Sequence, residues 1–283
     1  MKKYMIRCDM EGVSGIVSYN QAEPGNEEYG YGRKMFMSDL LALVEGLNQG
    51  GADEIVIYDE HYYGRNIEVE KLPANTMAIC GKPPYRKGWP GGLDNSYEGL
   101  ILLGMHSKYG TERGLLHHSY ELDIKNIQIN GVSVGEIGME AAIAGDLKIP
   151  LLLVCGDSAA INEAKELVEG VDGVIVKKSL DTVGGLCYSS ELTAEWIRNA
   201  ARVTAEKSKD IKPLYFKGGI SLKISLNEGK YLNYINKYFK NMLAEEDTLF
   251  FEGECVNDTW AEYLAFKLEV SKKIKPEEQQ NDG

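Results

Sequence analysis

The sequence lacks long hydrophobic runs and an excess of basic residues. No stretch of about 18 apolar residues occurs, so a membrane-spanning helix is not expected. Arg7 interrupts the first apolar stretch before a secretory h-region forms. The formal net charge is −12, whereas attraction to nucleic acid or to an anionic membrane depends on clustered Lys and Arg. We therefore expect a cytoplasmic protein whose partners include neither nucleic acid nor a membrane.

Cysteine and histidine are both scarce. The five cysteines include no Cys-x-x-Cys pair, which argues against a disulfide framework and against a thiolate zinc site. The glycine-rich segment 12–15 lacks the lysine of a P-loop, and the early glycines do not make a dinucleotide fingerprint, so nucleotide binding is not indicated. Only four histidines are present, which makes the position of each one informative.

Apolar strand patterns alternate with helical patterns along most of the chain. Strands are predicted at 3–8, 54–58, 99–104, 125–130, 132–134, 150–155, 220–226 and 248–251. Helices are predicted at 29–48, 136–146, 158–169, 189–207, 229–243 and 257–271. This alternation predicts an α/β fold with a mostly parallel sheet flanked by helices. Asn130-Gly131 adds an antiparallel hairpin.

The pattern also suggests how the chain is divided. We expect an α/β catalytic core that binds metal at residues 1–210 and a smaller C-terminal α/β subdomain at 211–272. The polar segment 273–283 reads as a flexible tail, because it offers almost no apolar surface to bury.

Charged side chains follow three of the predicted strands at the point where each strand ends. Asp9 and Glu11 follow the first strand, Asp59-Glu60-His61 follow the second and His106 follows the third. The carboxyl ends of parallel strands meet at one edge of a sheet, where ligands bind. Carboxylates and imidazoles are the ligands of Zn²⁺ and related ions, and clustered carboxylates repel one another unless a cation neutralises them. The pattern therefore predicts a divalent-metal site.

Each of these residues also has a purely structural interpretation. Asp9 fits the cap of a turn, and Glu11 and Glu60 fit solvated loop carboxylates, which is the interpretation we prefer for Glu60. Glu136, at the start of a predicted helix, fits an acid that complements the helix dipole. A lone histidine after a strand is more often a structural hydrogen-bond donor than a ligand. Two of only four histidines at matching strand ends weaken that interpretation.

Five short motifs carry a resemblance to a known family. They are Asp9-Met10-Glu11-Gly12-Val13-Ser14-Gly15, Asp59-Glu60-His61, Leu103-Gly104-Met105-His106, His118-Ser119 and Val134-Gly135-Glu136-Ile137-Gly138. In order and spacing they closely resemble the zinc-dependent D-aminopeptidases of the dipeptide-permease operon type. The resemblance covers roughly residues 1–160.

The resemblance implies a site, an activity and an assembly. The site would hold two Zn²⁺ ions per chain, with Asp9 bridging both, Glu11 and His61 on one, and His106 and Glu136 on the other. His118 would serve in catalysis without binding metal, and we expect only a supporting role for His117. The family consists of metal-dependent aminopeptidases that release N-terminal residues, often D-amino acids, from short peptides. Its members form homodecamers whose sites face an internal channel.

The sequence departs from the family pattern in two places, and other activities use the same ligand types. Gly156-Asp157-Ser158 stands where the family tends to have Gly-Asp-Asp, and the chain beyond Ile211 shows no resemblance.

One alternative activity is that of a dinuclear metallohydrolase of phosphoesters or non-peptide amides. Phosphoester hydrolysis would be favoured by a basic clamp, for which Lys82, Arg86, Lys87, Lys108 and Arg113 are candidates. The other alternative is a non-enzymatic, peptide-binding ring protein.

Overall fold

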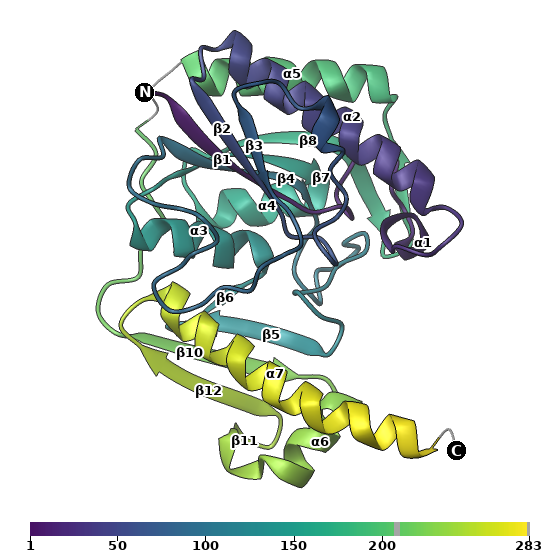
Figure 1. Ribbon diagram of the computed structural model, residues 1–283, viewed down its shortest axis with the longest axis vertical. Coiled ribbons are helices and arrows are strands. Elements are labelled where there is room, and N and C mark those ends of the chain that lie inside the picture. Colours follow the sequence, from purple (N-terminus) through teal and green to yellow (C-terminus); the bar gives the residue numbers. More distant parts are fainter. Residues whose placement is uncertain (207–209, 282–283) are drawn as a thin grey trace.

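A seven-stranded sheet forms the centre of the computed structural model, which describes residues 1–206 and 210–281 (Figure 1). The strand order is β3-β2-β1-β4-β7-β8-β9. The strands are β1 (Lys3–Cys8), β2 (Glu54–Asp59), β3 (Thr76–Ile79), β4 (Gly99–Met105), β7 (Leu151–Asp157), β8 (Asp172–Asp181) and β9 (Gly184–Cys187). Neighbouring strands are parallel except β8 and β9. The predicted α/β fold with a mostly parallel sheet is confirmed.

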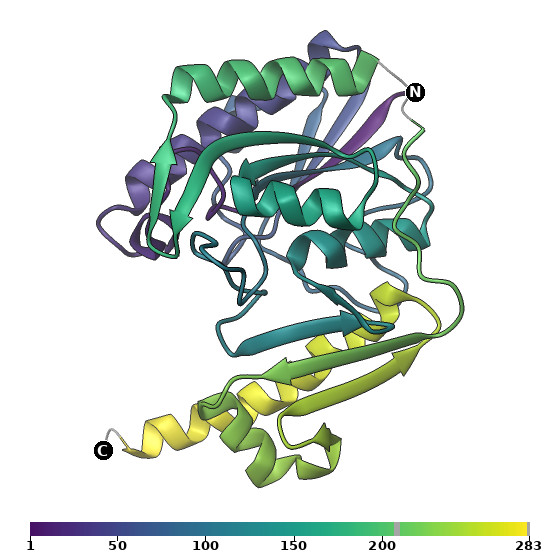
Figure 2. The same cartoon turned by 180° about the vertical axis from the view of Figure 1, so that it is seen from behind.

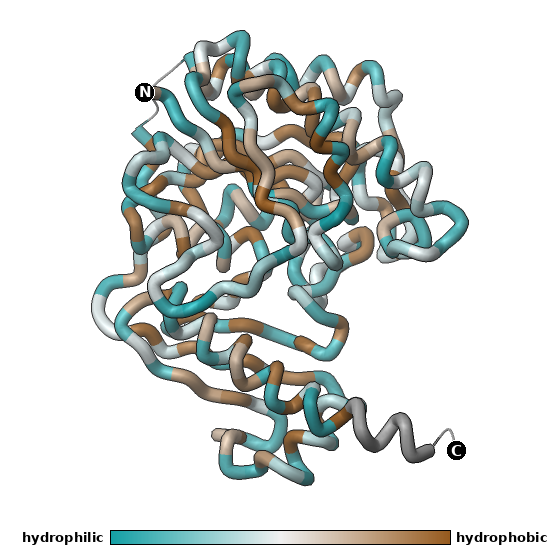
Figure 3. Tube along the Cα trace, viewed as in Figure 1, coloured by the Kyte–Doolittle hydropathy of each residue, from teal (hydrophilic) through white to brown (hydrophobic). Residues whose placement is uncertain are grey.

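Helices cover both faces of this sheet (Figures 1 and 2). Helices α2 (Tyr29–Gln49) and α5 (Ser190–Glu206) pack together on one face, and α3 (Glu136–Asp146) and α4 (Ser158–Leu167) lie on the other. Because both faces are covered, every residue of β4 and β7 is buried. Figure 3 shows the resulting band of hydrophobic residues through the central strands. The short helix α1 (Tyr19–Ala22) lies beside α2.

A second, antiparallel sheet lies below α3 and α4 in Figure 1 and has the order β11-β12-β10-β5-β6. Its strands are β5 (Ile124–Ile129), β6 (Val132–Val134), β10 (Ile220–Leu226), β11 (Leu243–Glu245) and β12 (Thr248–Gly253). Asn130 and Gly131, both at positive φ, form the predicted hairpin turn between β5 and β6. Helix α7 (Val256–Asn281) packs on β10 and β12 of this sheet, and α6 (Lys230–Tyr238) packs against α7. Short 3-10 helices occupy Val69–Lys71 and Lys240–Met242.

Several features differ from the sequence-based expectations. The sequence did not predict β3, β8, β9, β11 or α1. In β8, Lys177 and Lys178 interrupt the apolar pattern, although Lys177 is fully buried. The segment predicted to be a flexible tail from residue 273 continues α7 as far as Asn281, and residues 282–283 lie outside the described part. None of the helices in the described residues is long and apolar enough to cross a membrane.

Candidate metal centre

Three adjacent strands bring the predicted site residues to one edge of the first sheet. Strand β1 lies between β2 and β4, so the loop after β1, which carries Asp9 and Glu11, lies between His61 and His106. The loop is held against β4 by two backbone hydrogen bonds, from Asp9 N to Leu103 O (2.8 Å) and from Gly12 N to Gly104 O (2.7 Å). The parallel order of these strands therefore brings together residues that are about a hundred positions apart.

The first group consists of Asp9, Glu11 and His61, all buried, with ligand atoms within 4.8 Å of one another. The His61 Nδ1 atom lies 2.7 Å from Asp9 Oδ1 and 3.2 Å from Glu11 Oε2. On the other side of the ring, Nε2 is 2.9 Å from the Ala22 carbonyl oxygen at the end of α1. Helix α1 thus fixes the orientation of the imidazole.

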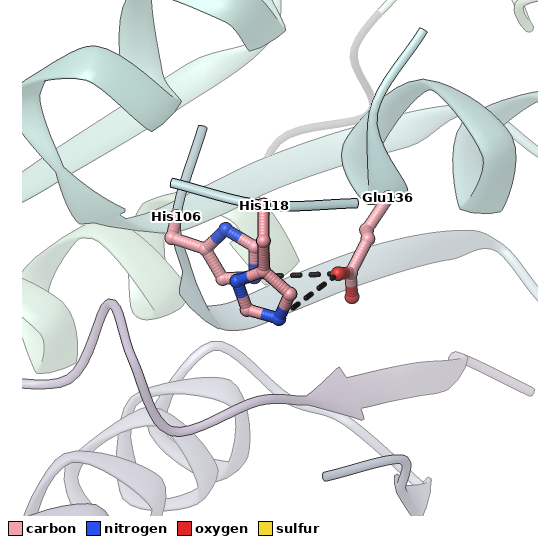
Figure 4. A group of neighbouring side chains, drawn as sticks. All are labelled: His106, His118 and Glu136. Atoms are coloured by element: carbon pink, nitrogen blue, oxygen red, sulfur yellow. Dashed lines mark ion pairs between the residues drawn. The ribbon is translucent and has the colours of Figure 1, made fainter. Parts of the chain in front are cut away.

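The second group consists of His106, His118 and Glu136, which converge from three separate segments (Figure 4). The His106 Nε2 atom lies 3.3 Å from Glu136 Oε1 and 3.2 Å from Asp9 Oδ2. His118 stacks on His106 with ring centroids 4.1 Å apart, and its Nε2 is 3.8 Å from Glu136 Oε1. Asp9 therefore contacts both groups, with one oxygen directed at each of two histidines.

The hydrogen bonds of the histidine rings indicate what this arrangement is built to hold. In His61, His106 and His118, one ring nitrogen lies 2.9–3.0 Å from a backbone carbonyl, to which it donates a proton. In the neutral ring the other nitrogen then directs a lone pair at carboxylate oxygens. Glu11 Oε2 and His106 Nε2 are buried and have no hydrogen-bond partner among the described residues. A divalent cation between these atoms would satisfy all of them, so the donor set fits a metal.

In the absence of a cation, protons on the histidines neutralise the carboxylates. The pKa values of the histidines are therefore expected to be raised, and they are. Burial lowers the pKa of His61, but the nearby carboxylates of Glu11 and Asp9 outweigh it and raise that pKa well above its ordinary value. The pKa of His106 is raised for the same reason by Glu136 and Asp9, again against the effect of burial. Burial raises the pKa of Asp9, but the neighbouring imidazoles of His106 and His61 outweigh it and lower that pKa well below its ordinary value. The site therefore attracts positive charge strongly.

A buried ionic network, which no sequence pattern indicated, lies behind the second group. Tyr120 donates its backbone N–H to Glu136 Oε1 (2.6 Å) and its hydroxyl to Glu140 Oε1 (2.7 Å), one helical turn further along α3. Glu140 also forms a buried ion pair with Arg7 of β1. Glu60, which we interpreted as a solvated loop carboxylate, instead accepts a hydrogen bond from the largely buried Tyr85. That interpretation of Glu60 was therefore wrong.

A buried lysine holds the loop of the first group. The Lys177 ammonium on β8 donates hydrogen bonds to the carbonyl oxygens of Glu11 (2.5 Å), Val13 (2.8 Å) and Ile16 (2.5 Å). The side chain is fully buried and has no ion pair with a carboxylate among the described residues. Burial lowers the pKa of Lys177 to about 8. Nothing local in the sequence distinguishes it from its exposed neighbour Lys178.

The two groups open into a cavity of about 390 Å³. Five of the predicted site residues line it: Asp9, Glu11, His61, His118 and Glu136. The other charged residues of its wall are Glu23, Glu60, Glu121 and Lys82, and the remaining residues are Tyr19, Tyr62, Tyr63, Tyr120 and Leu122. His117, by contrast, is directed elsewhere and accepts the backbone N–H of Gly110 (3.0 Å). Among the described residues, the cavity is therefore acidic, with Lys82 as its one lysine or arginine.

Comparison with known proteins identifies the family. Residues 1–261 match the family described as D-aminopeptidase. The D-aminopeptidase of Bacillus subtilis (strain 168) is 30% identical over 215 residues, which cover 76% of this chain and 77% of that protein. The fold matches the solved structure of DppA from Bacillus subtilis, a zinc-dependent D-aminopeptidase and self-compartmentalizing protease. The TM-score is 0.87 and the identity 24%, over 95% of this chain and 98% of that one. The chain therefore belongs to the D-aminopeptidase family and is an aminopeptidase, a hydrolase of peptide bonds.

Proposed function

We propose that this chain binds two zinc ions and releases N-terminal residues, D-amino acids among them, from short peptides. The observation that carries the proposal is the placement of Asp9, whose Oδ1 lies 2.7 Å from His61 and whose Oδ2 lies 3.2 Å from His106. A carboxylate placed in this way can bridge two ions. Both similar Bacillus subtilis proteins are D-aminopeptidases, and the solved one is zinc-dependent.

The proposed ligands divide between the two ions. Asp9 bridges both, and the remaining positions belong to Glu11 and His61 on one side and to His106 and Glu136 on the other. Zinc in such a site supplies an activated water nucleophile and an electrophile for the peptide carbonyl. The acidic lining of the cavity favours a peptide whose positive amino terminus enters first.

His118 is proposed to move protons. Its Nδ1 lies 3.0 Å from the Leu116 carbonyl oxygen, and donating to it leaves the Nε2 lone pair on the side of Glu136. The ring lines the cavity, so it can reach a substrate. An imidazole placed there can accept a proton from the nucleophile and deliver it to the leaving amine.

The test compares His118→Ala with His106→Ala, using metal content by mass spectrometry and kcat on the same preparations. We expect His118→Ala to keep both ions and to lose roughly 10²–10⁴-fold in kcat, the range for a positioned acid–base group. We expect His106→Ala to lose an ion. A His118→Ala protein that lacks one ion would make His118 a ligand, which its place in the second group permits geometrically. Full-length preparations of the wild type with only trace metal would contradict the proposal as a whole.

The assembly is proposed to be a homodecamer in the cytoplasm with its sites facing an interior. The structural relative is a self-compartmentalizing protease, which supports an enclosed oligomer. Exposed apolar side chains in and beside the β8–β9 hairpin, Leu180, Val183 and Leu186, offer a surface for self-association. All five cysteines are free, as is usual in a reducing compartment. A monomer by light scattering at micromolar concentration would refute the oligomer.

The geometry favours peptides over phosphoesters. A phosphoester site would need a basic clamp, and Lys82 is the one candidate that lines the cavity within the described residues. Lys87 pairs with Glu262, and the guanidinium of Arg86 lies over the Trp89 ring. Apart from Lys82, the basic residues that the sequence analysis named for phosphate binding therefore have other partners or lie outside the cavity.

A further inference from the structure

A second cavity, of about 180 Å³, adjoins the metal-lined one. The two cavities share four lining residues, Glu60, Lys82, Tyr120 and Glu121. Tyr120 connects the two cavities, because its backbone N–H donates to the proposed ligand Glu136 while its ring centroid lies 4.7 Å from that of Trp260 on α7. A molecule bound at the proposed ligands can therefore extend into the second cavity.

The walls of this second cavity differ chemically from those of the first. They are formed largely by rings and aliphatic groups, including Pro83, Pro84, Trp260 and Leu264. The hydroxyl groups of three of its four tyrosines have partners in the protein: Tyr58 donates to the Pro83 carbonyl, and Tyr85 and Tyr120 donate to carboxylates of the buried network. The buried hydroxyl of the fourth, Tyr263, has no hydrogen-bond partner among the described residues. Apart from that hydroxyl, what these side chains can offer a ligand is apolar ring surface. Such a wall selects for apolar groups.

The distribution of charge decides which end of a peptide lies here. Beyond the proposed ligands, the first cavity carries three carboxylates, those of Glu23, Glu60 and Glu121, and Lys82 as its one lysine or arginine among the described residues. A peptide has a single backbone cation, at its amino terminus, and that end is favoured in an acidic cavity. The first residue of the substrate is thus the one whose side chain lies nearest the shared wall.

We propose that the second cavity is the subsite for the side chain of the first substrate residue, and that it accepts large aliphatic and aromatic side chains. This inference rests on the proposed aminopeptidase function and adds a substrate class to it. The chain then releases large apolar N-terminal residues faster than alanine, because burying a larger apolar side chain in the cavity stabilises the transition state.

The test uses a cavity-filling variant with a matched control on the same helix. Leu264→Trp fills the subsite from α7, whereas Leu268→Trp makes the same change at a position that is 55% exposed and does not line the cavity. Tripeptides X-Gly-Gly, with X as D- or L-alanine, leucine or phenylalanine, are assayed with each protein. For the wild type we expect kcat/KM for phenylalanine to exceed that for alanine by about 10–100-fold. Leu264→Trp should remove most of this preference and leave the alanine peptide within about twofold, and Leu268→Trp should change neither.

Binding of phenylalaninamide and alaninamide, measured by calorimetry, gives a second readout that does not require turnover. We expect phenylalaninamide to bind at least about tenfold more tightly to the wild type and to lose this advantage in Leu264→Trp. Equal affinity of the two amides, or an equal loss for all tripeptides in Leu264→Trp, would overturn the subsite. The tripeptide Ala-Phe-Gly is assayed as well, because its large side chain is on the second residue. A loss in Leu264→Trp that is confined to Ala-Phe-Gly would also overturn the subsite, because the cavity would then serve the second residue. If no tripeptide is cleaved, the proposed function fails, and amide binding still decides the subsite.

Discussion

At the scale of single residues, the site depends on groups that never touch a substrate. Lys177 is the clearest case, because one ammonium holds three carbonyls of the loop that carries Asp9 and Glu11. In Lys177→Met these buried acceptors lose their partner, at a cost of about 1–3 kcal/mol for each unsatisfied group. We expect zinc affinity to fall at least tenfold by competition with a chelator. Lys178→Met, the matched change at the exposed neighbour, should bind zinc as the wild type does. Equal zinc affinity in both variants would contradict the positioning role.

Asp39 on α2 gives a prediction about pH. Burial raises the pKa of Asp39 to about 6, against hydrogen bonds from the N–H and hydroxyl of Ser14. When protonated, Asp39 can donate to Ser14, which donates to Thr193 (2.8 Å), which donates to the Ser190 carbonyl. The stabilising contribution of Asp39 is therefore complete below its unfolded pKa near 4 and is lost as the pH rises through about 6.

Asparagine reproduces the protonated form of Asp39 at every pH. We expect the free energy of unfolding of Asp39→Asn, relative to the wild type, to increase between pH 4 and 7 by up to about 3 kcal/mol. Urea unfolding of both proteins at several pH values measures this difference, in which the other titrating groups cancel. A difference that does not change with pH would show that Asp39 is ionised throughout.

At the scale of elements, the loop after β1 works because it lies directly against β4. A Cβ atom at Gly12 would lie 1.9 Å from the Met105 carbonyl oxygen, so any side chain there must push the loop away from the strand. We expect Gly12→Ala to destabilise the fold by about 1–3 kcal/mol and to reduce the metal content by moving Asp9 and Glu11. Gly30→Ala in α2 is the control, since no atom lies within 4 Å of a Cβ there. It should be neutral or slightly stabilising. Full metal content in Gly12→Ala would show that the loop tolerates displacement.

At the scale of the whole molecule, the two sheets are linked by residues 124–134, which lie between β4 and β7 in the sequence but form β5 and β6 of the second sheet. Strand β5 pairs with β10 from the C-terminal part and with β6, and α3 contacts α7. The division of the chain at residue 210 remains a prediction. The pairing of β5 with β10 joins residues on the two sides of that division. Because the sheets are joined in this way, we expect them to unfold together.

Hydrogen exchange measures whether they do. Amides of β4 in the first sheet and of β10 in the second should exchange with the same opening free energy and the same dependence on urea. The short helix α1 should exchange earlier and serves as the internal reference. An opening of β10 and β12 that needs at least about 2 kcal/mol less than that of β4 would instead show that the second sheet unfolds as a separate unit.

The sequence by itself determined most of the longer elements and the residue types at the strand ends. Strand β1 was predicted with the bounds it has, and the Asn130-Gly131 turn was predicted in its place, because both depend on neighbouring residues. The metal-ligand types were recognisable for the same reason, since Asp9, His61 and His106 each lie close after the end of an apolar run. The motifs around them also pointed to the family that the comparisons show.

Only the tertiary structure decided which of these residues meet. The placement of β1 between β2 and β4 puts Asp9 between two histidines. The order of strands in a sheet cannot be predicted from a local sequence pattern. The roles of Lys177, Glu60 and Glu140 could not be predicted, because their partners lie far away in the chain. Without known partners, a charged side chain is expected to be exposed to solvent. The second cavity is a further example. Its walls come from segments near residues 58, 84, 120 and 260, which only folding brings together.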